Sequence, residues 1–273
     1  MPTLQARTGK VAYSDTGSGR PIVLLHATLH DRHDFDAISD ALSRHHRVIA
    51  VDWPGHGESD RADGITGPLL ADVLEDIVDA LRLESIVLIG NSVGGSAAAR
   101  LAISRPQTVA GLVLVNTGGF VPNNAFTMLF CRLMGTPAIA RRLLPRLVPL
   151  YMRAQTAADE RIVEKAVARA RTADGAATAA SLWRSFASPE YDLRARAPAL
   201  RAPTLVVWGV RDPTLSVRIG RATHAGIEHS EFVALQTGHV VFSSDPEGFL
   251  RVVEPFLRQI DADGHVETAS EPG

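Results

Sequence analysis

Short apolar runs alternate with longer amphipathic segments along most of this 273-residue chain, and this alternation limits the fold more than any other feature. Near-continuous apolar runs are typical of parallel strands that are buried on both faces. The clearest strands are predicted at 22–25, 47–51, 85–89, 109–115 and 204–208, with a weaker one at 231–235. The pattern predicts an α/β fold in which helices flank both faces of a mostly parallel sheet.

Two helices and one edge strand can be predicted in more detail. Apolar residues recur at helical spacing in 66–81, where Thr66 is a suitable N-cap, and a second helix is predicted at 93–104. Residues 11–15 predict a strand, and the glycine-rich turn at 16–19 suits an antiparallel hairpin at the sheet edge. The sheet is therefore expected to be mixed.

The alternation stops between residues 120 and 195, where the sequence reads as helices broken by five prolines. Strand-like sequence resumes after this stretch, so we predict an inserted helical cap at 120–195. The α/β core would then comprise 1–119 and 196–260. The polar, aperiodic residues 261–273 are expected to form a disordered tail.

The amino-acid composition indicates which kinds of partner and which cellular compartment to expect. The content is 45% hydrophobic and 21% charged, and a net charge of -2 gives no basic field to hold nucleic acid. A lone cysteine, Cys131, fits a reducing compartment. No apolar run approaches the roughly 20 residues that span a bilayer, and no export signal is visible. We expect a soluble, cytoplasmic protein that binds a small molecule and neither nucleic acid nor membrane interior.

The most informative passage is the sequence 85–95, in which an apolar strand leads through Gly90-Asn91-Ser92-Val93-Gly94 into a helix. A serine on such a tight turn stands above the sheet in strained backbone geometry, and flanking glycines avoid Cβ clashes. The following helix N-terminus favours developing negative charge. This passage predicts a nucleophile elbow with Ser92 as nucleophile, against the alternative of a chance motif in a turn of small residues.

A serine nucleophile needs a base and a group that orients the base. Asp212 follows the strand at 204–208, at the carboxyl end where α/β sheets keep their sites, and His239 lies in a loop beyond the last strand. Alone, they could be a turn-forming aspartate and a surface histidine. The order serine, acid, histidine predicts a Ser92-His239-Asp212 catalytic triad.

Several motifs together resemble the α/β-hydrolase fold superfamily across residues 10–260. Besides the elbow they are Val23-Leu24-Leu25-His26, Asp52-Trp53-Pro54-Gly55-His56-Gly57-Glu58-Ser59-Asp60, Trp208-Gly209-Val210-Arg211-Asp212 and Gly238-His239. The pattern is similar to small capped bacterial serine hydrolases such as enol-lactonases and carboxylesterases. The resemblance implies an oxyanion hole made by the backbone N–H groups of Val93 and Thr28, and no cofactor. The chain departs from many relatives by having Ala27 after His26 in place of glycine.

The substrate pocket is expected under the cap, which is rich in large apolar residues: Phe126, Met128, Leu129, Phe130, Met134, Leu182, Trp183 and Phe186. So many large apolar side chains are not expected in a segment that lies only on the surface, although any one of them could simply attach the cap to the core. The pocket residues singled out are His26, Phe130, Trp183 and Val240.

Two other clusters were weighed against the triad. His26, His30, Asp31 and His33 crowd one stretch, but their spacing is wrong for a metal site and no later ligand set completes one. No metal is therefore expected. Arginines interleaved with leucines between 141 and 153 form a basic amphipathic patch. Such a patch is more commonly a solvent-exposed face of a cap than a surface that binds a membrane or attracts an anionic substrate.

These features predict an esterase or lactonase that acts through an acyl-enzyme. Three alternatives stay open: a C–C bond hydrolase of ring-cleavage products, a cofactor-free perhydrolase or haloperoxidase, and a non-catalytic ligand-binding protein. C–C hydrolases share the elbow but usually have glycines after the residue matching His26 and a tryptophan at position 240. Perhydrolases usually carry an aromatic residue near position 28, which here is Thr28. The sequence leaves the oligomeric state open, with a homodimer as one option.

Overall fold

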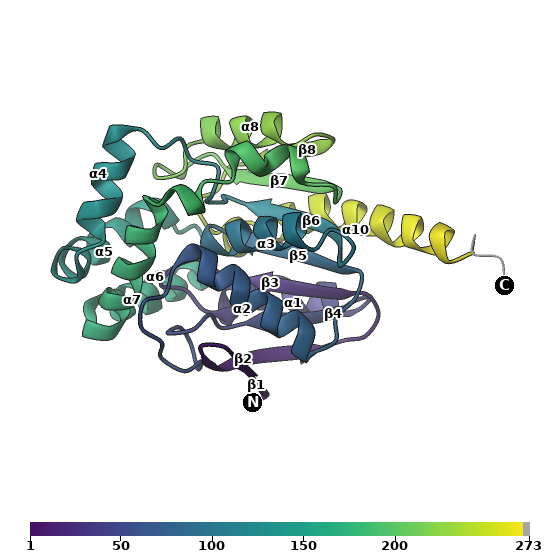
Figure 1. Ribbon diagram of the computed structural model, residues 1–273, viewed down its shortest axis with the longest axis horizontal. Coiled ribbons are helices and arrows are strands. Elements are labelled where there is room, and N and C mark those ends of the chain that lie inside the picture. The colour runs from purple at the N-terminus through teal and green to yellow at the C-terminus, as the bar shows by residue number, and fades with distance from the viewer. Residues whose placement is uncertain (270–273) are drawn as a thin grey trace.

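Eight strands form one mixed sheet in the computed structural model, which describes residues 1–269, and side chains up to residue 263. The strand order is β1-β2-β4-β3-β5-β6-β7-β8 (Figure 1). The strands are β1 (Thr3–Ala6), β2 (Gly9–Thr16), β3 (Pro21–Leu25), β4 (Arg47–Val51), β5 (Ile86–Asn91), β6 (Val109–Val115), β7 (Thr204–Gly209) and β8 (Ser230–Leu235). The predicted α/β fold with a mostly parallel sheet is confirmed.

The antiparallel edge differs from the prediction. A strand not expected from the sequence, β1, pairs antiparallel with β2, and β2 pairs antiparallel with β4. The hairpin turn therefore lies between Ala6 and Gly9, whereas the turn at 16–19 leads to β3, which is separated from β2 by β4. Only Leu4 and Ala6 of the four-residue β1 are buried, and so short an alternation is a weak signal.

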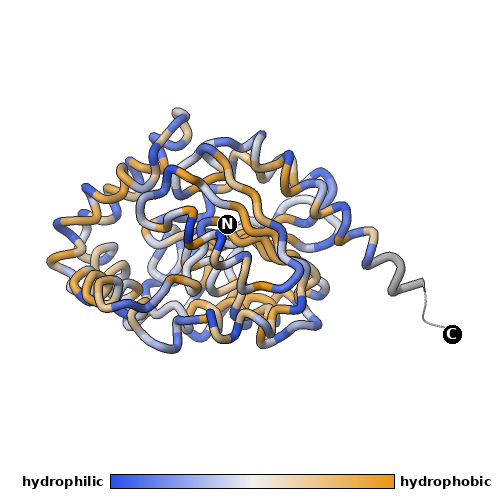
Figure 2. Tube along the Cα trace, turned by 90° about the horizontal axis from the view of Figure 1, so that it is seen from above, coloured by the Kyte–Doolittle hydropathy of each residue, from blue (hydrophilic) through white to orange (hydrophobic). Residues whose placement is uncertain are grey.

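Helices cover both faces of the sheet (Figure 1). One face carries α2 (Gly67–Ala80), α3 (Val93–Ser104) and α8 (Val217–Gly226), and the other carries α1 (Asp36–Ser43) and α10 (Pro246–Ala269). Each face has its own apolar core, and the strand side chains alternate between the two. Figure 2 shows the hydrophobic strands in the interior, while the surrounding helices alternate between polar and apolar residues.

Four helices occupy the segment between β6 and β7, where the sequence predicts a cap. They are α4 (Ala125–Met134), α5 (Pro137–Met152), α6 (Ala157–Arg171) and α7 (Ala173–Phe186). These helices gather at one end of the sheet, opposite the end from which α10 projects (Figure 1). They pack on one another through small and apolar residues such as Ala140, Leu144 and Ala166. No helix in the described chain is long and apolar enough to cross a membrane.

The C-terminal segment departs from the expectation of disorder after residue 260. Helix α10 continues to Ala269, and Asp261 within it accepts a hydrogen bond from Arg20 at 2.8 Å and pairs with His46 at 3.1 Å. The polar composition thus continues a helix that is held to the sheet domain near residue 261. The remainder of the predicted tail, 270–273, lies outside the described residues.

Close packing of α3 against the sheet explains why the turn between them is rich in glycine. A Cβ atom at Gly94 would lie 2.2 Å from the carbonyl oxygen of Leu25 on β3, and a Cβ at Gly90 would lie 2.5 Å from the carbonyl oxygen of Gly94. Neither space holds even a methyl group. The glycines let the N-terminus of α3 approach the ends of β3 and β5, which places Ser92 at that edge.

This packing predicts that Gly94→Ala lowers the free energy of unfolding by about 1–3 kcal/mol or more, because backbone must move to admit the methyl group. Urea denaturation would measure the change. Gly226→Ala is a matched control, since the nearest atom to its added Cβ would be 3.8 Å away, and it should be as stable as the parent. Equal stability of the two variants would contradict the role assigned to this contact.

Candidate active site

Ser92 stands between β5 and α3 with φ 55° and ψ −117°, a backbone conformation that costs a non-glycine residue free energy. Neighbouring backbone maintains it: the Ser92 N–H donates to the carbonyl of Val115 at 3.1 Å, and its carbonyl accepts from Gly118 at 2.9 Å. The side chain lines a cavity. Both the position and the strain match those expected of a nucleophile elbow.

Asp212 and His239 meet at the carboxyl ends of β7 and β8. His239 Nδ1 donates to Asp212 Oδ2 at 2.5 Å, and this leaves Nε2 for another partner. The other carboxylate oxygen, Oδ1, accepts from the backbone and hydroxyl of Thr214 at 2.8 and 2.6 Å. The carboxylate is thus held on both sides, and it fixes the tautomer and direction of the imidazole.

The environment of Asp212 keeps it ionised although it is buried. Burial by itself would raise the pKa of Asp212, but the charge and hydrogen bond of His239, with the hydrogen bond from Thr214, hold the pKa below its ordinary value. A carboxylate that accepts several hydrogen bonds behaves in this way. Asp212 therefore remains a charged acceptor for the imidazole over the neutral range of pH.

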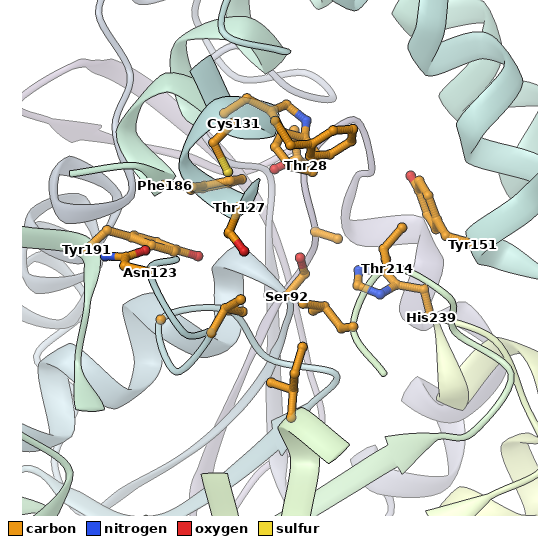
Figure 3. A pocket seen from close by; sticks show the side chains of 18 of the residues that line it. Thr28, Ser92, Asn123, Thr127, Cys131, Tyr151, Phe186, Tyr191, Thr214 and His239 are labelled. Atoms are coloured by element: carbon orange, nitrogen blue, oxygen red, sulfur yellow. The ribbon is translucent and has the colours of Figure 1, made fainter. Parts of the chain in front are cut away.

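The structure brings all three predicted triad residues together. Figure 3 shows the hydroxyl of Ser92 and the ring of His239 facing one another in the cavity. The two side chains are not joined by a hydrogen bond in the described chain. Hydrogen bonds of this kind are often long without substrate and tighten in the Michaelis complex.

The backbone N–H groups of Val93 and Thr28 are candidates for holding a negative oxygen. Val93 is the first residue of α3, where backbone N–H groups have no intrahelical partner. Thr28 lies in the loop after β3, and Leu29 next to it adopts a φ of 74°. The Leu29 N–H donates to His56 Nε2 at 3.2 Å, so a side chain from another loop helps to hold the backbone of this loop.

Two buried histidines frame this loop as neutral hydrogen-bonding groups. His26 Nε2 accepts from the backbone N–H of Trp53 at 3.0 Å, while its Nδ1 donates to the carbonyl of Ala27 at 2.7 Å. Burial lowers the pKa of His26 to about 3 and also lowers that of His56 well below its ordinary value. Both rings therefore join the loop to the Asp52–Asp60 turn without adding charge to the site.

Two of the four predicted pocket residues do not line the cavity. His26 is fully buried and both of its ring nitrogens are engaged with backbone. Val240 is also fully buried, in the core beneath the site. Those two predictions were wrong because sequence proximity to Thr28 and His239 does not determine which way a side chain faces.

The other two, Phe130 and Trp183, line a cavity of about 370 Å³ next to Ser92. Their rings meet edge to face with centroids 5.4 Å apart, and Phe186 packs on Trp183 at the same separation. The wall is mostly apolar and aromatic, and its labelled polar groups lie on both sides of Ser92, with Asn123 on one side and Thr214 on the other (Figure 3). It includes no lysine or arginine among the described residues.

The sequence analysis missed several residues that support the triad. Asn116 follows β6 and donates to Asp212 Oδ2 at 2.8 Å, and the Asn91 amide donates to the carbonyl of His239 at 3.0 Å. Both stand at strand ends, a signal that could have identified them. The cap residue Tyr151 accepts the backbone N–H of His239 at 3.1 Å, and nothing local in the sequence indicates this contact.

In the fold, the three histidines of the stretch 26–33 have different hydrogen-bonding partners. His26 faces the buried turn, His30 pairs with Asp34 at 2.5 Å, and His33 pairs with Asp36 at 3.1 Å on the surface. Among the described residues, no group of three or more histidine, cysteine, aspartate or glutamate side chains is arranged to hold a metal ion. Cys131 lines the cavity, and burial raises the pKa of its thiol to about 11.

A family model described as the alpha/beta hydrolase fold matches residues 20–246 of this chain. The chain therefore belongs to the alpha/beta hydrolase fold family, as the sequence motifs predicted. The matched region runs from the start of β3 to the start of α10 and contains every residue of the site described above.

Named relatives indicate a hydrolase but differ in the bond they act on. A 2-hydroxy-6-oxononadienedioate/2-hydroxy-6-oxononatrienedioate hydrolase of Paraburkholderia phymatum is 30% identical over 92% of this chain and 91% of its own length. A thermophilic esterase from Thermogutta terrifontis is 27% identical with a TM-score of 0.83, covering 95% and 99% of the two chains. An enol-lactonase from Burkholderia xenovorans LB400, 22% identical over 94% and 100%, shares the fold with a TM-score of 0.82.

The neutral state of His26 predicts how stability depends on pH. Its pKa is about 3 in the folded protein and ordinarily 6.5, so between these values the unfolded chain binds a proton that the folded chain does not. The free energy of unfolding should therefore fall as the pH is lowered below 6.5, by up to about 1.4 kcal/mol per pH unit from this group.

Chemical denaturation of His26→Asn at pH 7.5, 6.5 and 5.5, values set by the roughly 6.5 ordinary pKa, would measure this dependence. We expect lower stability than the parent at pH 7.5 but a shallower decline towards acid. His229→Asn is the control, because the side chain of His229 is 89% exposed, and its decline should match that of the parent. Parallel curves for His26→Asn and the parent would refute the assignment.

Proposed function

We propose that this protein is a serine hydrolase that cleaves an uncharged carboxylic ester or lactone through an acyl-enzyme. The observation that carries the proposal is that a strained serine, an imidazole and a buried carboxylate meet at one edge of the sheet, beside a largely apolar cavity. The N–H groups of Val93 and Thr28 complete the arrangement that acyl transfer needs.

In the first half-reaction, Ser92 Oγ forms a bond to the substrate carbonyl carbon while His239 Nε2 takes the hydroxyl proton. The electron pair of the carbonyl moves to its oxygen, which the Val93 and Thr28 N–H groups hold as an oxyanion. Collapse of this intermediate breaks the bond to the alcohol oxygen, which receives the proton from His239. In a lactone, that alcohol stays attached to the acyl group.

In the second half-reaction, a water molecule replaces the alcohol. His239 Nε2 removes one proton from the water as its oxygen attacks the acyl carbon, and the proton then passes to Ser92 Oγ as the ester bond breaks. Asp212 keeps Nδ1 protonated throughout and stabilises the positive imidazole by its charge. No other group is required, so the proposal includes no cofactor.

The charge of the cavity favours a neutral substrate over a dicarboxylate such as the one for which the Paraburkholderia relative is named. A carboxylate enclosed in a largely apolar cavity is stabilised best by a cationic partner, and the described wall contains neither lysine nor arginine, only neutral donors such as Asn123 and Thr127. Its fixed charges include Asp192, which would repel an anion, although Arg194 pairs with it at 2.7 Å. C–C hydrolysis of a ring-cleavage dicarboxylate is therefore the less favoured use of this site.

A neutral serine-directed phosphonate should attach one label to the protein, and Ser92→Ala should abolish both the label and ester hydrolysis, with a loss of about 10³-fold or more. Mass spectrometry and p-nitrophenyl ester turnover measure the two effects. Ser104→Ala is the control, because this serine lies at the far end of α3 and bonds to Glu75 on α2. Retained turnover in Ser92→Ala would disprove the mechanism.

The same assay separates the competing functions. Repeated turnover of neutral esters or lactones supports the proposal, whereas a single stoichiometric burst indicates a binding protein that has kept the pocket. Faster turnover of a dienedioate ring-cleavage product than of any neutral ester would assign the C–C reaction instead.

Trp183→Ala should change substrate preference and not only rate. Trp183 lines the cavity against Phe130, so its removal enlarges the space available to the acyl or alcohol group. We expect the ranking of p-nitrophenyl esters by chain length to shift towards longer chains, with the free energy of unfolding lowered by about 1–2 kcal/mol. A uniform loss across all esters with a large fall in thermal midpoint would show that Trp183 only supports the cap.

A further inference from the structure

A second aspartate–histidine pair, formed by Asp34 and His30, is connected to His239 through Tyr151. This pair takes no part in the proposed reaction. His30 Nδ1 donates to Asp34 Oδ2 at 2.5 Å, and His30 Nε2 lies 3.2 Å from the hydroxyl of Tyr151. The side chain of His30 is fully buried and that of Asp34 is 5% exposed. His30 lies in the loop after β3 and Asp34 in the short 3-10 helix Arg32–Phe35 that follows it, whereas Tyr151 belongs to the inserted helix α5.

The hydrogen bonds of this group have one direction. With the Asp34 carboxyl at Nδ1 of His30, Nε2 is the ring atom that is left to face the hydroxyl of Tyr151. Burial, and then the negative charges of Asp34 and Asp212, raise the pKa of Tyr151, so its hydroxyl keeps its proton and donates to His30. Asp34, His30 and Tyr151 are thus arranged as acid, histidine and hydroxyl. Asp212, His239 and Ser92 have the same order.

Tyr151 contacts His239 through both its backbone and its ring. Its carbonyl accepts the backbone N–H of His239 at 3.1 Å, and the two rings meet edge to face with centroids 5.1 Å apart and planes at 71°. A Cβ atom at Gly238 would lie 1.8 Å from the Met152 carbonyl oxygen, so the loop before His239 lies directly against the end of α5. Figure 3 places Tyr151 beside His239, on the side away from Tyr191.

One hydrogen bond to Asp212 fixes Nδ1 of His239 but still allows the imidazole to tilt about that bond. A tilt would swing Nε2 away from Ser92, and displacements of about 1 Å in such groups can cost 10²-fold in rate. The ring of Tyr151 stands where it limits this tilt. A phenol ring can do so only if it is itself held in place, and the hydrogen bond to His30 holds it.

We propose that Tyr151 is a positioning residue for His239: the Asp34–His30 pair holds the phenol by its hydroxyl, and the phenol holds the imidazole in the orientation that faces Ser92. The inference rests on the proposed function, since it assigns His239 the role of base. It makes the contact between the end of α5 and the loop of His239 a condition for full activity.

Tyr151→Phe tests the inference, because it keeps the ring and the backbone contact and removes only the link to His30. We expect kcat for p-nitrophenyl butyrate to fall by about 10-fold with KM changed less than about two-fold, and the rate of phosphonate labelling to fall by the same factor. The loss should be similar for all esters, because in this proposal the hydroxyl holds the ring that positions His239 and does not bind the substrate.

His30→Ala should reproduce the loss, and the double variant should be no slower than the slower single variant, because both changes break one chain of contacts. If His30→Ala fails to fold, Asp34→Asn replaces it in the same cycle. His33→Ala is the control: it removes a histidine from the same loop whose partner, Asp36, is on the surface, and it should leave kcat unchanged.

Unchanged kcat in Tyr151→Phe, losses that multiply in the double variant, or a loss confined to substrates that carry a hydrogen-bond donor would each overturn the inference. These outcomes are distinct from failure of the proposed function. If Ser92→Ala is inactive and Tyr151→Phe is fully active, only the positioning role is wrong. If Ser92→Ala retains activity, the triad itself is wrong.

Discussion

Everything in the site depends on how closely α3 can approach the sheet at the ends of β3 and β5. Gly90 and Gly94 leave no room for a side chain, so the helix begins almost in contact with the Leu25 carbonyl. Ser92 stands at this contact in its strained backbone conformation, and Val93 next to it begins the helix. The other site residues then follow from the parallel strands, whose carboxyl ends meet along one edge.

The buried histidines and the buried aspartate of the site differ in charge. His26 and His56 are kept neutral by burial and serve as hydrogen-bonding spacers for the loop that carries Thr28. Asp212 is kept ionised by its donors, and the cavity wall adds no cation. In the proposed reaction, an uncharged substrate would enter this cavity without losing the solvation of a carboxylate, and the Asp212 carboxylate would stabilise the positive imidazole.

The inserted helices do more than cover the cavity. Helix α7 contributes Trp183 and Phe186 to its aromatic wall, and α5 ends against the loop of His239. Arg169 on α6 also reaches the core, where it donates to the carbonyl of His30 at 2.8 Å. The same helices that line the cavity therefore also contact the loop of His239 and the loop that carries His30. Under the proposed function, changes in these helices would affect rate as well as specificity.

The sequence by itself determined the sheet, most of its strands and the three triad candidates. Buried strands and amphipathic helices have periods that neighbouring residues reveal, and the elbow and the ends of β7 and β8 place Ser92, Asp212 and His239 on one edge. The sequence did not indicate the short β1 or the continuation of α10 past residue 260. Four alternating residues and a polar helix end have the same local pattern as loops.

Only the tertiary structure decided which side chains face the cavity and what supports His239. His26 and Val240 are neighbours of site residues in sequence but point into the core, whereas Asn91 and Tyr151 reach the histidine from far away. The His30–Tyr151 contact joins residues 121 positions apart, across the boundary between core and inserted helices. Such contacts depend on how separate elements pack against each other, and no local pattern of residues encodes that packing.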